Sequence, residues 1–78
     1  MKIEVLGMGC PKCRKLYQDV LAAVGELNIH PDIIKVEDIQ KIVEHGVMST
    51  PALVIDGKIK AMGSVPDIGK IKEWLSGA

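Results

Sequence analysis

The chain has two cysteines, Cys10 and Cys13, which lie in the stretch GMGCPKC at residues 7–13. Two thiols at this spacing can form a reversible disulfide, hold a soft metal ion between two thiolates, or supply half of a zinc site. A zinc site requires further ligands, and the two histidines, His30 and His45, match no common zinc-finger spacing. We interpret both histidines as surface residues. The disulfide and soft-metal hypotheses therefore remain, and the rest of the chain must separate them.

The size and composition of the chain limit its function. Its 78 residues correspond to one domain, residues 1–78, with an aliphatic core, because two close cysteines cannot link distant elements. Ten basic residues balance ten acidic ones, which argues against nucleic-acid binding. The sequence shows no secretory signal pattern and no apolar segment of membrane-spanning length. We therefore expect a cytoplasmic monomer without membrane contact, where a CxxC pair is typical of catalysis or metal binding.

The spacing of apolar residues predicts an α/β fold with the element order β-α-β-α-β-β-α. Asp56 and Gly57 form a strong two-residue hairpin signal between the last two strands. The first three elements form a right-handed parallel crossover, and the hairpin completes a four-stranded mixed sheet packed with three helices. The predicted strands cover residues 2–6, 33–36, 52–55 and 58–62, and the predicted helices cover residues 11–27, 37–46 and about 65–77.

The helix that begins at Pro11 gives the two cysteines different surroundings. Cys13 continues the apolar side of this helix and is expected to face inward, whereas Cys10 lies at the N-cap, nearer to solvent. A helix N-terminus lowers the pKa of a thiol, and Lys12 and Arg14 add positive charge nearby. We therefore expect Cys10 to be the nucleophile and Cys13 the resolving thiol of a disulfide exchange. The apolar side of the helix comprises Leu16, Tyr17, Val20, Leu21, Val24 and Leu27.

The two later helices are predicted from shorter patterns. The second helix is expected to bury Ile39, Ile42 and Val43. Ser64 and Asp67 have the spacing of a capping box, which is expected to start the last helix. The inward-facing residues of that helix are Ile68, Ile71, Trp74 and Leu75.

A second stretch, STPALVIDGKIKAMG at residues 49–63, places Pro51 directly before a predicted strand. Together with CPKC opening a helix, the Asp-Gly hairpin and GSVPDI before the last helix, it resembles the thioredoxin and glutaredoxin superfamily over nearly the whole chain. The chain looks most similar to small glutaredoxin-like, redox-active disulfide proteins of archaea and bacteria. The resemblance implies a thioredoxin-like fold and a thiol–disulfide oxidoreductase, such as a protein-disulfide reductase, without a metal or organic cofactor. It also implies two partners, a disulfide-containing protein or small thiol substrate and a reductase or thiol reductant of unknown identity.

The resemblance assigns roles to individual residues. Cys10 and Cys13 match the redox-active pair, and Pro51 matches the cis-proline that lies over the disulfide. Thr50 matches the residue whose backbone pairs with an extended substrate peptide or with glutathione. Lys12, between the two cysteines, is a further candidate for substrate binding.

Two further matches imply roles for polar residues. Residues 63–68 are similar to the G-G-x-x-D-L segment of glutaredoxins, in which the aspartate binds the amino group of glutathione. Ser64 replaces the second glycine, so Ser64 and Asp67 are candidate glutathione contacts as well as candidate capping residues. Glu4 matches a buried acidic residue six positions before the first cysteine. It is a candidate proton relay for Cys13, and the alternative is an accessible carboxylate on a strand face.

The soft-metal hypothesis rests on a local similarity. GMGCPKC resembles the GMxCxxC loop of heavy-metal-associated domains, which carry ions such as Cu(I) between two thiolates. Those domains follow the order β-α-β-β-α-β, whereas the last segment of this chain has a helical pattern. A soft-metal carrier is therefore the alternative function, and a non-catalytic adaptor with a redox-switched CxxC is a third.

The resemblance to thioredoxin also shows one departure beside the cysteine pair. Gly9 replaces the aromatic residue that precedes the first cysteine of thioredoxin, which implies less apolar surface for binding protein substrates.

Overall fold

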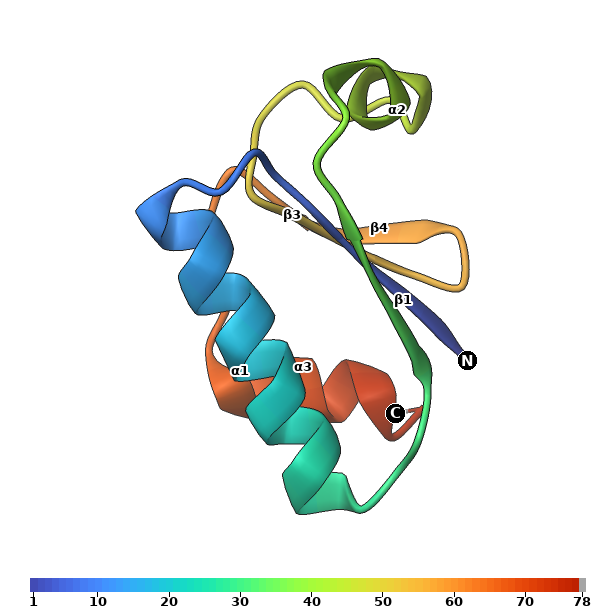
Figure 1. Ribbon diagram of the computed structural model, residues 1–78. Coiled ribbons are helices and arrows are strands. Elements are labelled where there is room, and N and C mark those ends of the chain that lie inside the picture. The colour runs from blue at the N-terminus through green and yellow to red at the C-terminus, as the bar shows by residue number, and fades with distance from the viewer. Residues whose placement is uncertain (78) are drawn as a thin grey trace.

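The computed structural model of the protein describes residues 1–77. The strands are β1 (Lys2–Leu6), β2 (Asp32–Val36), β3 (Ala52–Ile55) and β4 (Lys58–Met62), and the helices are α1 (Pro11–Leu27), α2 (Ile39–Glu44) and α3 (Ile68–Leu75). Within the described residues, the strands form one mixed sheet in the order β2-β1-β3-β4 (Figure 1). The predicted fold class and element order are confirmed.

β1 lies inside the sheet, and its two neighbours run in different directions. It pairs in parallel with β2 and antiparallel with β3, so that Val5 lies between Lys35 and Leu53. β3 and β4 form an antiparallel hairpin. Its turn residues Asp56 and Gly57 have φ angles of 50° and 81°, in the left-handed region that this two-residue turn requires. The predicted parallel pair and the predicted hairpin are both confirmed.

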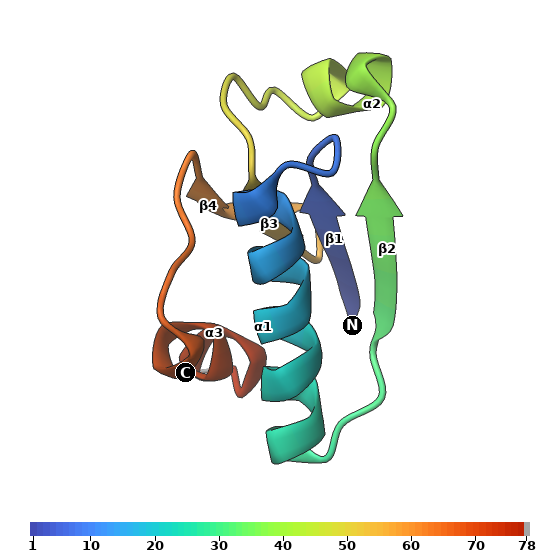
Figure 2. The same ribbon diagram turned by 60° about the vertical axis from the view of Figure 1, so that its left-hand side comes forward.

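Alternating side chains along β1 face two separate hydrophobic clusters. Ile3 and Val5 face α1 and α3 and belong to the larger cluster, which includes Leu16. Leu6 faces the other way and joins a smaller cluster with Ile42 of α2. Figures 1 and 2 show α1 and α3 on one side of the sheet, and α2 near the end at which β1 leads into α1. The redox pair and α2 therefore share one end of the molecule.

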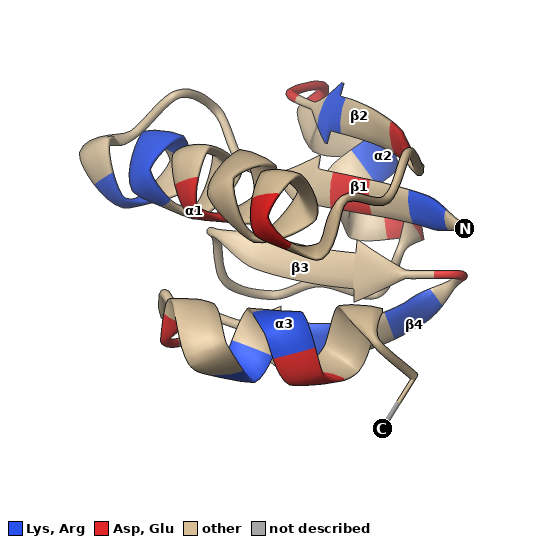
Figure 3. Cartoon of the chain, turned by 90° about the horizontal axis from the view of Figure 1, so that it is seen from below, with Lys and Arg blue, Asp and Glu red and all other residues tan. Residues whose placement is uncertain are grey.

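The surface carries mixed charge. Basic and acidic residues both occur along β1, α1 and α3 in the view from below (Figure 3). The helices within residues 1–77 are too short or too polar to cross a membrane.

α1 has the predicted bounds, but its buried side is narrower than predicted. Cys13, Leu16 and Val20 are buried, whereas Leu21 is exposed, so the prediction for Leu21 is wrong. Successive helical residues are rotated by about 100°, which carries Leu21 past the buried stripe. Ala23 completes that stripe, although its small side chain gives little hydrophobic signal in the sequence. The edge of the core contains Tyr17, Val24 and Leu27, as predicted.

α2 is shorter than predicted and buries one residue. Ile42 is buried, but Ile39 and Val43 are exposed, so the prediction that these two face inward is wrong. A helix of six residues makes fewer than two turns, which leaves room for one side chain against the sheet. Two apolar side chains on this helix are therefore left on the surface.

α3 begins later than the predicted capping box requires. Asp67 is itself the N-cap, and its side chain makes no capping hydrogen bond, so the prediction of a box opened by Ser64 is wrong. Pro66 disfavours helical backbone at Val65, and the helix therefore cannot start directly after Ser64. The predicted inner side of this helix is confirmed, with Ile71 and Leu75 buried and Ile68 and Trp74 packed against the core.

Candidate active site

Cys10 and Cys13 form a disulfide at the N-terminus of α1. Cys10 is the N-cap, with extended backbone, and its sulfur accepts a hydrogen bond from the N–H of Cys13 at 3.1 Å. Pro11 follows at the first helical position, where its missing N–H costs nothing. Cys10 is half-buried, whereas Cys13 is only 5% exposed. The expected difference in exposure between the two cysteines is confirmed.

Gly7 allows the loop after β1 to pass close to Cys13. A Cβ atom built on Gly7 would overlap the sulfur of Cys13 and lie 2.9 Å from its Cβ. Gly9, two residues later, has a φ of 84°, in the left-handed region that glycine tolerates best. Both glycines are thus part of the site. In the sequence they mark only the end of a strand.

Thr50 and Pro51 precede β3, and the peptide bond between them is cis, as the family resemblance implies. Pro51 is buried, and its carbonyl accepts a hydrogen bond from the N–H of Gly63 at 2.8 Å. Thr50 is exposed, and within residues 1–77 no backbone partner binds its N–H or its carbonyl. A main-chain donor and acceptor are therefore available to an extended partner at this position.

An apolar groove lies beside Thr50. Its volume is about 210 Å³, and its rim is formed by Met8 before the disulfide, Ile39 and Val43 of α2, and Met48 after α2. These four side chains are exposed, and Met48 is 90% exposed. Exposed apolar surface beside Thr50 thus comes from α2, from the loop after it and from Met8. Sequence reasoning missed the groove because it placed Ile39 and Val43 in the core.

Glu4 is buried on the face of the sheet that Leu6 occupies, opposite α1. Its carboxylate lies 2.9 Å from Nε2 of His45, the C-cap residue of α2. The other ring nitrogen of His45 lies 2.8 Å from the carbonyl of Lys41. The prediction that His45 is a plain surface histidine is therefore wrong. Sequence reasoning missed the pair because its members are 41 positions apart in the chain.

The pKa of His45 is raised above its ordinary value of 6.5. The Lys41 carbonyl is the largest cause, and the hydrogen bond and negative charge of Glu4 act in the same direction. Burial and the positive charge of Lys2 oppose them. Both ring nitrogens can donate only in the protonated ring, so this geometry favours the imidazolium form.

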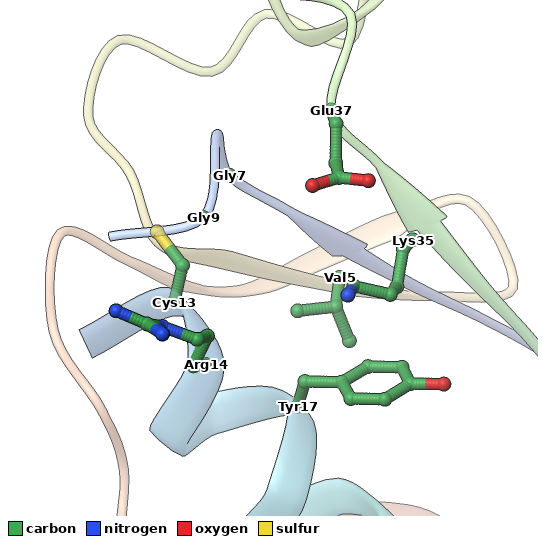
Figure 4. Close-up of a pocket in the computed structure, with 8 residues that line it drawn as sticks. All are labelled: Val5, Gly7, Gly9, Cys13, Arg14, Tyr17, Lys35 and Glu37. Carbon is green, nitrogen blue, oxygen red and sulfur yellow. The ribbon is translucent and has the colours of Figure 1, made fainter. Parts of the chain in front are cut away.

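A narrow crevice lies beside Cys13, between α1 and the ends of β1 and β2 (Figure 4). Val5 forms part of its wall, and Tyr17 lies one helical turn after Cys13. Lys35 of β2 and Glu37, which directly follows β2, line the crevice from the side of the sheet. The Lys35 ammonium lies 4.9 Å from the centre of the Tyr17 ring. The sequence contains one signal for this arrangement, the alternation of side chains along the second strand.

The remaining predicted residues lie around these features. Lys12 is exposed in the first turn of α1. Ser64 and Asp67 are exposed, and Asp67 lies in an open depression with Lys15 and Val65. That depression shares no lining residue with the apolar groove or with the crevice.

Comparison with known proteins identifies the family. A family model described as a thioredoxin domain matches residues 1–76. The chain belongs to the thioredoxin family. It is 38% identical to the thioredoxin of Methanothermobacter thermautotrophicus over 76 residues, which cover 97% of this chain and 99% of the relative. It is 42% identical to the thioredoxin of Methanocaldococcus jannaschii over 73 residues, which cover 94% of this chain and 84% of the relative. It is also 33% identical to a probable thioredoxin of Archaeoglobus fulgidus over 66 residues, which cover 85% of this chain and 71% of the relative.

The family and the disulfide together decide between the hypotheses left open by the motif. The protein is a thioredoxin-type thiol–disulfide oxidoreductase whose CxxC disulfide joins Cys10 and Cys13. The predicted redox function is confirmed in preference to the soft-metal carrier and the non-catalytic adaptor.

Proposed function

We propose that Cys10 attacks disulfides of protein substrates and that Cys13 resolves the resulting mixed disulfide. The observation that carries this assignment is the position of Cys10 at the N-cap of α1, half-buried, while Cys13 is buried behind it. The positive end of a helix and its free N–H groups stabilise a thiolate at the N-cap. Lys12, exposed in the first turn, adds positive charge beside the attacked disulfide.

Each turnover transfers two electrons in two exchange steps. The Cys10 thiolate attacks one sulfur of the substrate disulfide, forms a mixed disulfide and releases the other substrate sulfur as a thiolate. The Cys13 thiolate then attacks the sulfur of Cys10, releases the second substrate thiolate and closes the Cys10–Cys13 disulfide. A reductase or a small thiol returns two electrons and restores both thiols.

The apolar groove supports protein substrates in preference to glutathione. An extended peptide that pairs with the free main-chain groups of Thr50, over Pro51, directs a neighbouring side chain toward the groove, because Thr50 is part of its lining. Ser64 and Asp67, the candidate glutathione contacts, border no part of that groove. Glutathione has no large apolar side chain with which to fill it.

We infer that this reaction takes place in the cytoplasm, between a monomer and its substrate. The mixed surface charge and the single partly exposed cysteine support a protein that meets its partners one at a time. A reducing compartment keeps the cysteine pair in the thiol form that attacks substrates.

The assignment is tested by reduction of insulin with dithiothreitol as electron source. We expect Cys10→Ser to abolish turnover, and Cys13→Ser to accumulate a mixed disulfide on Cys10 that mass spectrometry identifies. If Cys10→Ser instead accumulates the mixed disulfide on Cys13 and retains the first exchange step, the roles are reversed.

A further inference from the structure

The exchange reaction requires Cys13 to lose a proton inside the protein. The inference rests on the proposed function, in which Cys13 is the resolving thiol. The thiolate is the nucleophile, so the Cys13 proton must leave before Cys13 attacks the sulfur of Cys10. Cys13 is 5% exposed, and bulk water therefore has little access to it. A nearby group is needed to carry the proton to solvent.

Glu4 is poorly placed for this task. It lies on the α2 face of the sheet, because it alternates with Val5, which faces α1. Its carboxylate is engaged by His45 at 2.9 Å. The proton outlet for Cys13 must therefore be sought on the α1 face.

Strand alternation brings a different carboxylate to that face. Val5 pairs with Lys35, so Lys35 shares the α1 face, and Glu37 follows at the next position of the same alternation. Cys13 and Tyr17 are four residues apart on α1, and they line the same crevice from the side of the helix. Figure 4 shows the Glu37 carboxylate and the Lys35 ammonium turned toward the space beside Val5 and Tyr17, with Cys13 at its edge next to Gly9.

The size of the crevice suits one water molecule. Its volume is about 20 Å³, slightly more than the ~10–15 Å³ that a single water requires. Glu37 is the one carboxylate among its lining residues, all of which lie in the described part of the chain. A Cβ built on Gly9 would lie 4.0 Å from the Oε2 atom of Glu37, which places this carboxylate against the loop before Cys10. Glu37 is itself exposed, so its carboxylate is in contact with solvent.

We propose that Glu37 positions one water molecule in this crevice, and that this water carries the proton of the Cys13 thiol to Glu37 and on to solvent. The electron pair left on the Cys13 sulfur attacks the sulfur of Cys10, and the substrate thiolate leaves. During reduction of the Cys10–Cys13 disulfide, the Cys13 thiolate that is released takes a proton back along the same route. Lys35 and Arg14, which also line the crevice, stabilise the negative charge on the thiolate.

The experiment follows the reaction of the fully reduced protein with 5,5′-dithiobis(2-nitrobenzoate) by stopped-flow absorbance. The first phase depends on reagent concentration and reports attack by Cys10. The second phase is independent of concentration and reports attack by Cys13 on the mixed disulfide. We expect Glu37→Gln to leave the first phase unchanged and to slow the second about tenfold or more. We also expect the second-phase rate of this variant to rise about tenfold per pH unit, more steeply than in the native protein.

Two variants serve as controls. Glu44→Gln removes the same charge from an exposed position at the end of α2, away from the crevice, and should change neither phase. Glu37→Asp keeps the carboxylate and should restore most of the second-phase rate. An unchanged second phase in Glu37→Gln overturns this inference alone, as does equal slowing by Glu44→Gln. A first phase that persists in Cys10→Ser contradicts the proposed function instead.

Discussion

The face of the sheet under α1 and α3 and the face under α2 are covered unequally. Helices of 17 and 8 residues pack on the first face, where Leu16 and Ile71 are fully buried. The second face has one helix of six residues, a smaller cluster, an ion pair between Glu4 and His45, and apolar side chains left on the surface. The well-packed face holds the disulfide in place, and the lightly covered face supplies the groove beside it. The groove proposed to receive substrates is thus built from the part of the molecule that is least able to bury its own apolar residues.

The largest expected effect concerns packing on the two faces. Leu16→Ala should lower the free energy of unfolding by about 3 kcal/mol, because it leaves a cavity in the larger cluster. Ile39→Ala on α2 removes an exposed side chain and should change the free energy of unfolding by less than about 0.5 kcal/mol. Urea unfolding of the oxidised protein measures both. A loss at Ile39 as large as that at Leu16 would show that α2 is packed as firmly as α1.

The next effect concerns the close approach of the β1–α1 loop to the redox pair. Gly7→Ala should destabilise the oxidised protein by about 2 kcal/mol, because the new methyl group overlaps Cys13. Gly25→Ala is the matched control, since it lies in a helix and nothing lies within 4 Å of the position that its new Cβ would take. We expect this control to stabilise the protein by about 0.5–1 kcal/mol in the same thermal or urea unfolding experiment. Opposite signs for the two substitutions are the result to look for.

The apolar groove should matter for protein substrates and not for small ones. The double substitution Val43→Lys and Met48→Lys should lower kcat/KM for insulin reduction by about tenfold, since two apolar contacts become charged. Reduction of a small aromatic disulfide should be unchanged. Ile59→Lys on β4 alters another exposed apolar residue outside the groove and should affect neither substrate. Equal losses on both substrates would mean that the lysines disturb the disulfide itself.

The smallest effect is a pH dependence of stability from His45. Because folding raises the pKa of His45, its stabilising contribution is complete below pH ~6.5 and is lost as the pH rises through the raised value. His45 is partly exposed, so the contribution is below about 1 kcal/mol. Urea unfolding at several pH values should show this loss in the native protein and in His30→Gln, but not in His45→Gln. A slope that survives in His45→Gln would assign the titration to another group.

The fold could be predicted from the sequence because its local patterns agree with one another. The Asp56–Gly57 turn, the helix opened by Pro11 and the stripe through Leu16 and Val20 each need only neighbouring residues, and each was predicted. The position of Cys10 at a helix end also followed from local pattern. Long-range features did not follow. The Glu4–His45 pair and the crevice at Glu37 depend on which strand faces are covered, and no local pattern specifies that.

The exposed side of α2 was missed for a related reason. The spacing of Ile39 and Val43 places them on the apolar side of a helix, and we predicted from this that the sheet would cover them. The short helix has no such surface, so the same residues form a rim. The capping box at Ser64 was wrong because one unfavourable neighbour, Pro66, outweighs a favourable spacing.

The packing of α3 against α1 has a consequence for the order of events during synthesis. The cysteines leave the ribosome early, yet the cluster behind them contains Ile71 and Leu75, which are among the last residues to be made. At ~5–20 residues per second, the nascent chain carries both thiols for several seconds before this cluster can close. During that interval the pair is open to premature oxidation or to exchange with another disulfide. A thioredoxin-type oxidoreductase thus itself depends, while it is being made, on surroundings that keep its thiols reduced.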